Sequence, residues 1–146
     1  MKNNWEKIKK VIVILNDESV QECSEYKTVI ETLGKEVSIL VLSKKKEIEM
    51  NETLGLFVLT KKDFNLLGKP KSEKAQLIFK ENFDLLLIKD VFEKKREKRI
   101  LKIKAKQKIG FNLKERNHFL DININTKSNS VEHLINFTKE ILEKII

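Results

Sequence analysis

Apolar residues in this chain gather in short continuous runs that polar stretches separate. Such runs, rich in β-branched residues, are typical of strands buried on both faces of a parallel sheet. The fourth run, FDLLLI, has the length and continuity expected of a central strand. The pattern predicts strands at Ile8–Leu15, Val37–Leu42, Leu56–Thr60, Phe83–Ile88 and Ile109–Phe111.

Between these runs, apolar residues recur near helical spacing. The first such segment lies between Asp17 or Ser19, either of which can cap a helix, and Gly34, where a helix would end in the left-handed region. Pro70 and Ser72 predict the start of a second helix, and Ser130 caps a third. We expect the last helix to cover the sheet with Leu134, Ile135, Ile141, Leu142 and Ile145.

The stretch FLDININ differs from the earlier runs because apolar and polar residues alternate in it. Alternation predicts a strand with only one covered face. The connection at residues 113–118 is too short for a crossover helix, so we expect this last strand to be an antiparallel edge. The alternation of strands and helices predicts an α/β fold: one domain, residues 1–146, a three-layer sandwich with a mostly parallel sheet of five to six strands, Rossmann-like or flavodoxin-like.

Composition narrows the cellular setting. The chain has 146 residues, 40% of them hydrophobic, which is enough for one core without disulfides or metal. Cys23 is the single cysteine, so the sequence predicts neither a disulfide nor a zinc site and favours a reducing compartment, simplest as the cytoplasm. The apolar run Val11–Leu15 is far too short for a signal or a membrane span, and we expect no membrane association.

The net charge of +8 is unevenly placed. Residues 93–116 hold eleven basic and three acidic side chains, so this window carries the whole surplus. Such a segment can attract phosphate backbones or anionic lipid headgroups by electrostatics alone, and the partners we expect for it are a nucleic acid or an acidic protein. It can equally be the solvated face of a helix, because lysine dominates the chain and planar phosphate recognition favours arginine. The candidate anion-binding face comprises Lys94, Lys95, Arg96, Lys98, Arg99 and Lys102.

In open α/β sheets, ligands bind beyond the carboxyl ends of the strands, near the point where strand order reverses. Several of the polar residues found there are also ordinary helix caps, so a structural role competes with a ligand-binding one. The turn after the first strand lacks the glycines of a dinucleotide site, and the chain has no P-loop. The candidate crevice residues are Asn16, Asp17, Ser19, Asp90 and Asn112.

The residue types that usually carry catalysis do not form a recognisable pattern. The two histidines, His118 and His133, have no metal-ligand or nucleophile partner at suitable spacing. Cys23 lies on the apolar stripe of its helix and is expected in the core. The sequence therefore predicts no catalytic residue, no metal and no cofactor.

Three stretches, KKDFNLLGKPKSEKA, NFDLLLIKD and KAKQKIGFN, in this order resemble a family of short, uncharacterised bacterial proteins known as a domain of unknown function. FDLLLIKD and ILKIKAKQKIGF are also similar, more distantly, to the first Rossmann half of heptosyltransferase-type glycosyltransferases. Those enzymes hold a nucleotide sugar chiefly with a second half, so this resemblance implies no catalysis by this chain alone. The matching positions are Asp63, Phe64, Gly68, Lys69, Gly110 and Phe111.

Three functions remain open from the sequence. The first is a non-catalytic binding domain with a basic face. The second is a degenerate or split transferase-like half that binds a phosphorylated or sugar ligand in the crevice. The third is a structural subunit that self-associates through the edge strand FLDININ.

Overall fold

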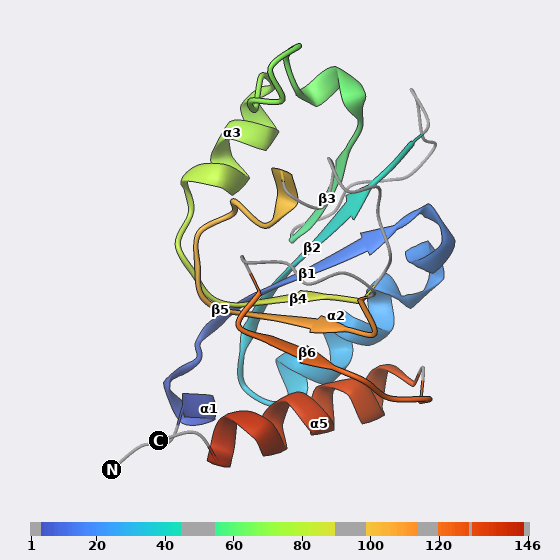
Figure 1. Cartoon of the computed structure of the whole chain (residues 1–146), viewed down its shortest axis with the longest axis vertical. Helices are drawn as coiled ribbons and strands as arrows, with labels where there is room; N and C mark the ends of the chain where they lie inside the picture. Colours follow the sequence, from blue (N-terminus) through green and yellow to red (C-terminus); the bar gives the residue numbers. More distant parts are fainter. Residues whose placement is uncertain (1–3, 45–54, 90–98, 114–119, 129, 145–146) are drawn as a thin grey trace.

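A computed structural model describes residues 4–44, 55–89, 99–113, 120–128 and 130–144. In these ranges the chain forms one parallel six-stranded sheet with helices on both faces (Figure 1). The strands are β1 (Lys10–Asn16), β2 (Glu36–Leu42), β3 (Leu56–Leu59), β4 (Phe83–Ile88), β5 (Ala105–Phe111) and β6 (Ile122–Ile124). The helices are α1 (Asn4–Lys7), α2 (Cys23–Thr32), α3 (Glu73–Lys80) and α5 (Val131–Lys144), with 3-10 turns η1 (Asp17–Glu22) and η2 (Lys61–Asp63).

The strand order is β3-β2-β1-β4-β5-β6. This is the Rossmann order, in which the chain builds the sheet outward from β1 in one direction and then outward from β4 in the other. The direction of growth reverses between β1 and β4, which pair in parallel register from Val11 with Leu85 to Ile14 with Ile88. The predicted α/β sandwich is therefore confirmed.

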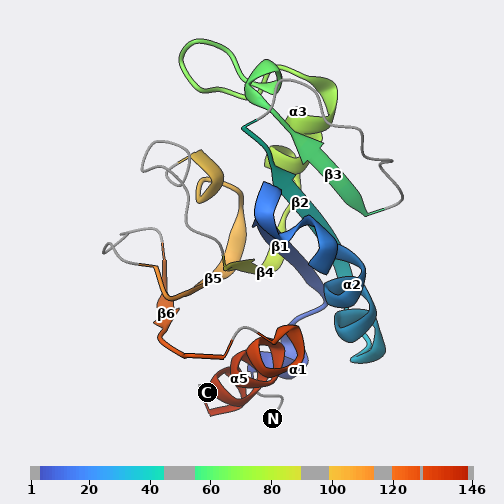
Figure 2. The ribbon, with the colours of Figure 1, turned by 90° about the vertical axis from the view of Figure 1, so that its right-hand side faces the viewer.

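Each face of the sheet has its own hydrophobic cluster, because successive side chains of a strand point to opposite faces. Val11, Val13 and Leu15 of β1 pack with residues of α1, α2 and α5. Ile12 and Ile14 pack on the other face with α3 and with the segment that precedes β5. Figure 2 shows α1 and α5 at one end of the molecule and α3 at the other.

The direction of β6 was predicted wrongly. Its three residues pair in parallel with Ile109, Gly110 and Phe111, at the carboxyl end of β5. A short parallel strand is possible here because the chain must travel back only about 10 Å, the length of three strand residues. A connection too short for a helix can span that distance, so the argument for an antiparallel strand fails.

Several local predictions are confirmed. Gly34 ends α2 with φ of 79°, and the Ser72 side chain caps α3 by accepting a hydrogen bond from the backbone N–H of Ala75. The segment after β1 differs from the expected helix in one respect, because it begins with the 3-10 turn η1 and becomes α-helical only at Cys23.

Cys23 lies in the core, as its position in the helical pattern predicted. Its side chain is buried, and burial, with a smaller contribution from the Glu22 carboxylate, raises the pKa of the thiol to about 11. The residue is therefore a core thiol rather than an activated nucleophile. Across the described parts of the chain, no helix has the length and apolar character needed to cross a bilayer.

Candidate binding surface

The turn after β1 stands at the point where strand order reverses, which is the usual ligand position of this fold. Asn16 ends β1, and its side chain accepts a hydrogen bond from the backbone N–H of Glu18 at 2.9 Å, which caps η1. The carboxylate of Asp17 accepts a hydrogen bond from the N–H of Lys44 at 3.0 Å, just beyond β2. Ser19 is buried within η1. These three predicted crevice residues lie together, and the contacts of Asn16 and Asp17 serve the fold.

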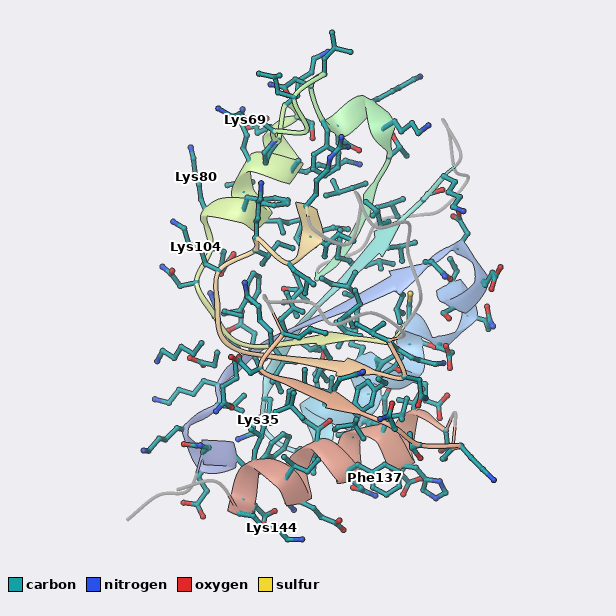
Figure 3. All side chains as sticks on the ribbon, in the orientation of Figure 1. Lys35, Lys69, Lys80, Lys104, Phe137 and Lys144 are labelled. Atoms are coloured by element: carbon teal, nitrogen blue, oxygen red, sulfur yellow. The ribbon has the colours of Figure 1, made fainter. Side chains whose placement is uncertain are left out.

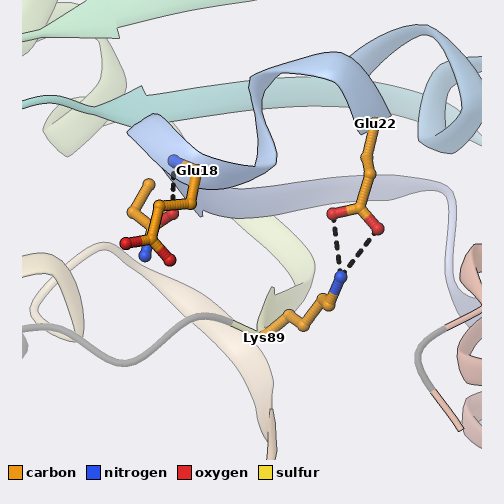
Figure 4. Close-up of polar contacts among 4 residues, drawn as sticks. Glu18, Glu22 and Lys89 are labelled. Carbon is orange, nitrogen blue, oxygen red and sulfur yellow. Dashed lines mark hydrogen bonds and ion pairs between the residues drawn. The ribbon is translucent and has the colours of Figure 1, made fainter.

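At the same edge of the sheet, an ion pair joins η1, which follows β1, to the residue that follows β4. Lys89, which follows β4, places its ammonium nitrogen 2.7 and 2.8 Å from the two carboxylate oxygens of Glu22 (Figure 4). The side chains are only 16% and 18% exposed, so solvent screens the attraction little. The pair therefore lies next to the point where strand order reverses, between β1 and β4. Lys89 was expected at this edge because it follows the fourth predicted strand, but its pairing with Glu22 was not predicted, because 67 positions separate the two residues in the sequence.

Asn112, a further predicted crevice residue, is not brought to this point. Asn112 lies beyond β5 with φ of 54° and exchanges two hydrogen bonds of 2.8 Å with the backbone of Thr126. It thus ties β5 to the chain after β6. Asp90 lies outside the described residues.

A depression opens instead at the carboxyl ends of β2 and β3. It is small, with a cavity volume of about 20 Å³, and it is partly open to solvent. Sequence reasoning missed Ser43 and Thr60, although both directly follow buried strands, which is where the rule for this fold places ligands. The depression is lined by Leu42, Ser43, Thr60, Lys61, Phe64, Arg99 and Ile100.

Phe64 of the KDFN motif forms part of the wall of this depression. Asp63 is buried and accepts a hydrogen bond from the N–H of Thr60 at 2.7 Å, while the Thr60 side chain caps η2 in return. The Phe64 ring meets Phe79 of α3 edge-on, with 6.0 Å between centroids. The guanidinium carbon of Arg99 lies over the Phe64 ring, 6.0 Å from the ring centroid. Of the predicted basic face, Arg99 is thus built into this wall.

The loop that follows explains Gly68. Its φ is 80°, which favours glycine, and a Cβ there would lie 2.5 Å from Nε of Arg99. Only a residue without a side chain lets the guanidinium pack this closely. Two parts of the chain that were singled out separately, the motif loop and the basic segment, therefore meet through Gly68 and Arg99.

Basic side chains gather around this loop. Residues 60–72 contain four lysines and one acid. The acid, Asp63, is buried, whereas all four lysines are exposed. Figure 3 shows Lys69 at this end of the molecule and Lys144 at the opposite end. We refer to Lys61, Lys62, Lys69, Lys71 and Arg99 as the basic end.

The rest of the predicted basic face is placed only in part. Lys102 is exposed just before β5. Lys94, Lys95, Arg96 and Lys98 lie outside the described residues. The segment after Arg99 is anchored by Ile100, Leu101 and Ile103, which are all buried.

A family model described as a family of unknown function (DUF6913) matches residues 1–145. The chain belongs to this family. No curated protein matches it. Membership confirms the predicted likeness to a domain of unknown function, while the bacterial origin and the similarity to heptosyltransferases stay predictions.

In this DUF6913 chain the remaining motif positions serve packing. Phe111 is fully buried in the core. A Cβ on Gly110 would lie 2.6 Å from a methyl carbon of Leu113, so the neighbouring side chains fill the space that glycine leaves. In DUF6913 as seen here, Gly110 and Phe111 are therefore structural residues.

His133 and the potential metal ligands can be located in the described part of the DUF6913 chain. No three histidine, cysteine, aspartate or glutamate side chains gather there as a metal site would need. His133 is exposed in the first turn of α5, and its Nδ1 lies 2.8 Å from the hydroxyl of Ser128. His118 lies outside the described residues. What the surface offers is positive charge beside an apolar depression.

Proposed function

We propose that this chain is a single, cytoplasmic, non-catalytic binding domain that takes a polyanionic partner at the basic end. The observation that supports this most is the charge of residues 60–72, where four exposed lysines accompany a single acid that is buried beneath them. No exposed carboxylate within that stretch opposes an approaching anion. Several cations on one end of a domain attract phosphate groups or carboxylates together, although each contributes little alone.

The class of partner follows from the kind of charge. Lysine ammonium groups act as mobile point charges and suit an extended anion better than a single planar group. An acidic protein or a nucleic acid offers such repeated charge. Lys94, Lys95, Arg96 and Lys98 precede Arg99 in the chain and are proposed to add to the same surface.

Retention on immobilised heparin across a salt gradient tests this function. One variant carries Lys61→Glu, Lys69→Glu and Lys71→Glu at the basic end. A matched control carries Lys7→Glu, Lys127→Glu and Lys144→Glu, three exposed lysines elsewhere, so that both variants have equal net charge. We expect the first variant to elute at much lower salt than the control.

The result that would refute the proposal is equal elution of the two variants, since retention would then depend on net charge alone. A third variant, Lys94→Glu with Lys95→Glu and Arg96→Glu, separates the contributions. If it elutes like the control, residues 94–96 are a solvated segment and the loop lysines carry the binding.

A second candidate function is a degenerate or split transferase-like half that binds a phosphorylated or sugar ligand. The observation in its favour is the depression, where Arg99 and Lys61 stand beside the hydroxyl residues Ser43 and Thr60. A thermal-shift panel of nucleotide sugars tests it. A ligand present at a hundredfold excess over Kd stabilises by about 2.7 kcal/mol, so no shift at high concentration would reject this function.

The third candidate, self-association through the edge strand, has weaker support. β6 does lie at the edge of the described sheet, but it is only three residues long. Short edge strands are one way in which proteins avoid pairing with a second copy. Light scattering that gave a monomeric mass would reject this candidate.

A further inference from the structure

Two adjacent leucines stand fully in solvent at the tip of the loop between η2 and α3. Leu66 is 103% exposed and Leu67 is 83% exposed, whereas almost every other large apolar side chain of the described chain is at least partly covered. Single exposed leucines are ordinary, but neighbouring ones on a projecting tip mark an interaction site. The loop lies at the upper end of the molecule in Figure 1, beyond α3.

Hydrogen bonds hold the leucines in this position. The side-chain oxygen of Asn65 accepts from the backbone N–H groups of Leu67 and Lys69, each at 2.9 Å. The backbone of Asn65 also bonds to Gly68 and Lys69, at 2.9 Å in both cases. The tip is therefore a closed turn rather than a slack loop, and its conformation itself places the leucines in water.

The base of the loop is anchored equally well. Phe64 and Pro70 form an antiparallel bridge, and the N–H groups of Lys71 and Ser72 both donate to the carbonyl oxygen of Asp63. The Phe64 ring packs on Phe79 of α3. Because base and tip are both fixed, exposing the leucines requires no rearrangement when a partner arrives.

The surroundings of the leucines indicate the partner. Lys61 and Lys62 lie on the turn before the loop, and Lys69 and Lys71 lie on its returning arm, all exposed. An apolar tip between cations complements a surface that is apolar beneath and negatively charged above, which describes an anionic bilayer. Nucleic acid would satisfy the lysines but offers the leucines no apolar cover.

We propose that the Leu66–Leu67 loop docks on anionic membrane surfaces, with both leucines entering the interface and the lysines contacting lipid phosphates and carboxylates. This inference rests on the proposed function, since it names the polyanion that the basic end takes. We predicted no membrane association because the apolar run Val11–Leu15 is too short to span a bilayer or to act as a signal. A loop tip that reaches only the boundary between headgroups and acyl chains needs no such segment.

Sedimentation with lipid vesicles tests the proposal, using phosphatidylcholine alone and phosphatidylcholine mixed with phosphatidylserine. We expect the wild-type chain to sediment with the mixed vesicles only. The variant Leu66→Ser with Leu67→Ser should bind mixed vesicles about tenfold or more weakly, because two apolar side chains no longer enter the interface. The same variant should elute from heparin like wild type, since its lysines are unchanged.

Leu77→Ser is the matched control, because Leu77 is an exposed leucine on α3, outside the loop. It should bind vesicles like wild type, and circular dichroism checks the fold of each variant. Vesicle binding that persists in the double serine variant overturns the inference. If wild type binds heparin but no vesicles, the membrane is the wrong partner and an acidic protein or nucleic acid replaces it. If wild type binds neither heparin nor vesicles, the proposed function is overturned as well.

Discussion

The centre and one end of the carboxyl edge of the sheet use their side chains in opposite ways. Between β1 and β4, where this fold usually binds ligands, Asn16, Asp17, Glu22 and Lys89 all contact other parts of the chain. Beyond β3, the loop uses its hydrogen bonds to keep two leucines in water. Charged side chains pair within the fold at the first place, whereas at the second the lysine side chains are exposed to solvent.

This contrast shows why residue type alone did not locate the surface. Polar residues at the reversal point matched the expected chemistry of a ligand crevice, yet they stabilise turns and connect strands. The loop looked like an ordinary connection with Gly68 and Pro70 in it. What distinguishes the loop is a hydrogen-bonded backbone turn that presents two leucines which the fold does not bury.

The largest effect that we expect in this comparison is that of Gly68→Ala. The substitution forces a Cβ into the left-handed region and against Arg99, and should lower the free energy of unfolding by about 2 kcal/mol. Gly34→Ala is the matched control, since Gly34 has nearly the same φ, 79°, but nothing within 4 Å of the added Cβ. It should cost about 1 kcal/mol. Urea denaturation measures both, and equal losses would mean that Arg99 moves aside freely.

Glu22→Gln tests whether the reversal point is structural. Removing one charge of this largely buried pair leaves Lys89 without its carboxylate, and the expected loss is about 1.5 kcal/mol, between the values for surface and buried pairs. Glu18→Gln, an exposed position on the same turn, should change stability little. If Glu22→Gln leaves the free energy of unfolding in urea unchanged, the ion pair contributes nothing to stability. The crevice would then be a candidate ligand site again.

Asn65→Ala tests whether hydrogen bonds hold the Leu66–Leu67 loop in its conformation. The variant loses the acceptor for the Leu67 and Lys69 amides, and we expect a loss of about 1 kcal/mol that is confined to the loop. Amide hydrogen exchange should show faster exchange at these two positions and unchanged protection in β1 and β4. Uniformly faster exchange would show instead that the loop and the sheet open together.

The smallest effect concerns pH and the opposite edge of the sheet. Burial alone would raise the pKa of Asp84, but the backbone N–H groups of Lys10 and Lys9, at 3.0 and 2.8 Å, and the Lys106 ammonium lower it below its ordinary value. A carboxylate with a lowered pKa in the folded state stabilises the fold above its unfolded pKa, near 4, and this stabilisation disappears as pH falls through the folded pKa.

Asp84→Asn should therefore be less stable than wild type at neutral pH and approach it in acid. Thermal unfolding from neutral to acidic pH measures the difference. A gap between the two curves that stays constant with pH would show that the contacts, and not the charge, stabilise this edge.

Much of the fold was predictable because burial on two faces leaves a strong pattern. Phe83–Ile88 was predicted to the residue, since every position except Asp84 is apolar and the run is bounded by polar residues. Gly34 was predictable because a helix that ends in the left-handed region needs glycine. The direction of β6 was not, because connection length excludes a helix but does not exclude a short return to a three-residue strand.

The candidate surface was predictable only in part. Ser43 follows one predicted strand and Thr60 ends another, so both could have been found by applying the same rule to every strand. Lysines at 61, 62, 69 and 71 were visible but were outweighed by the denser segment after Glu93. The packing of Arg99 on Gly68 joins residues 31 positions apart, and a single sequence carries no sign of such a contact.

The buried thiol of Cys23 can report how often the core of the protein opens. Because the pKa of this thiol is about 11, a negligible fraction is thiolate in the native state at neutral pH, and the side chain is covered as well. A thiol-labelling reagent can therefore modify the wild-type chain only when the α2 side of the core opens. Because the sequence has a single cysteine, the labelling rate measures how often this opening occurs, and no probe has to be introduced into the molecule.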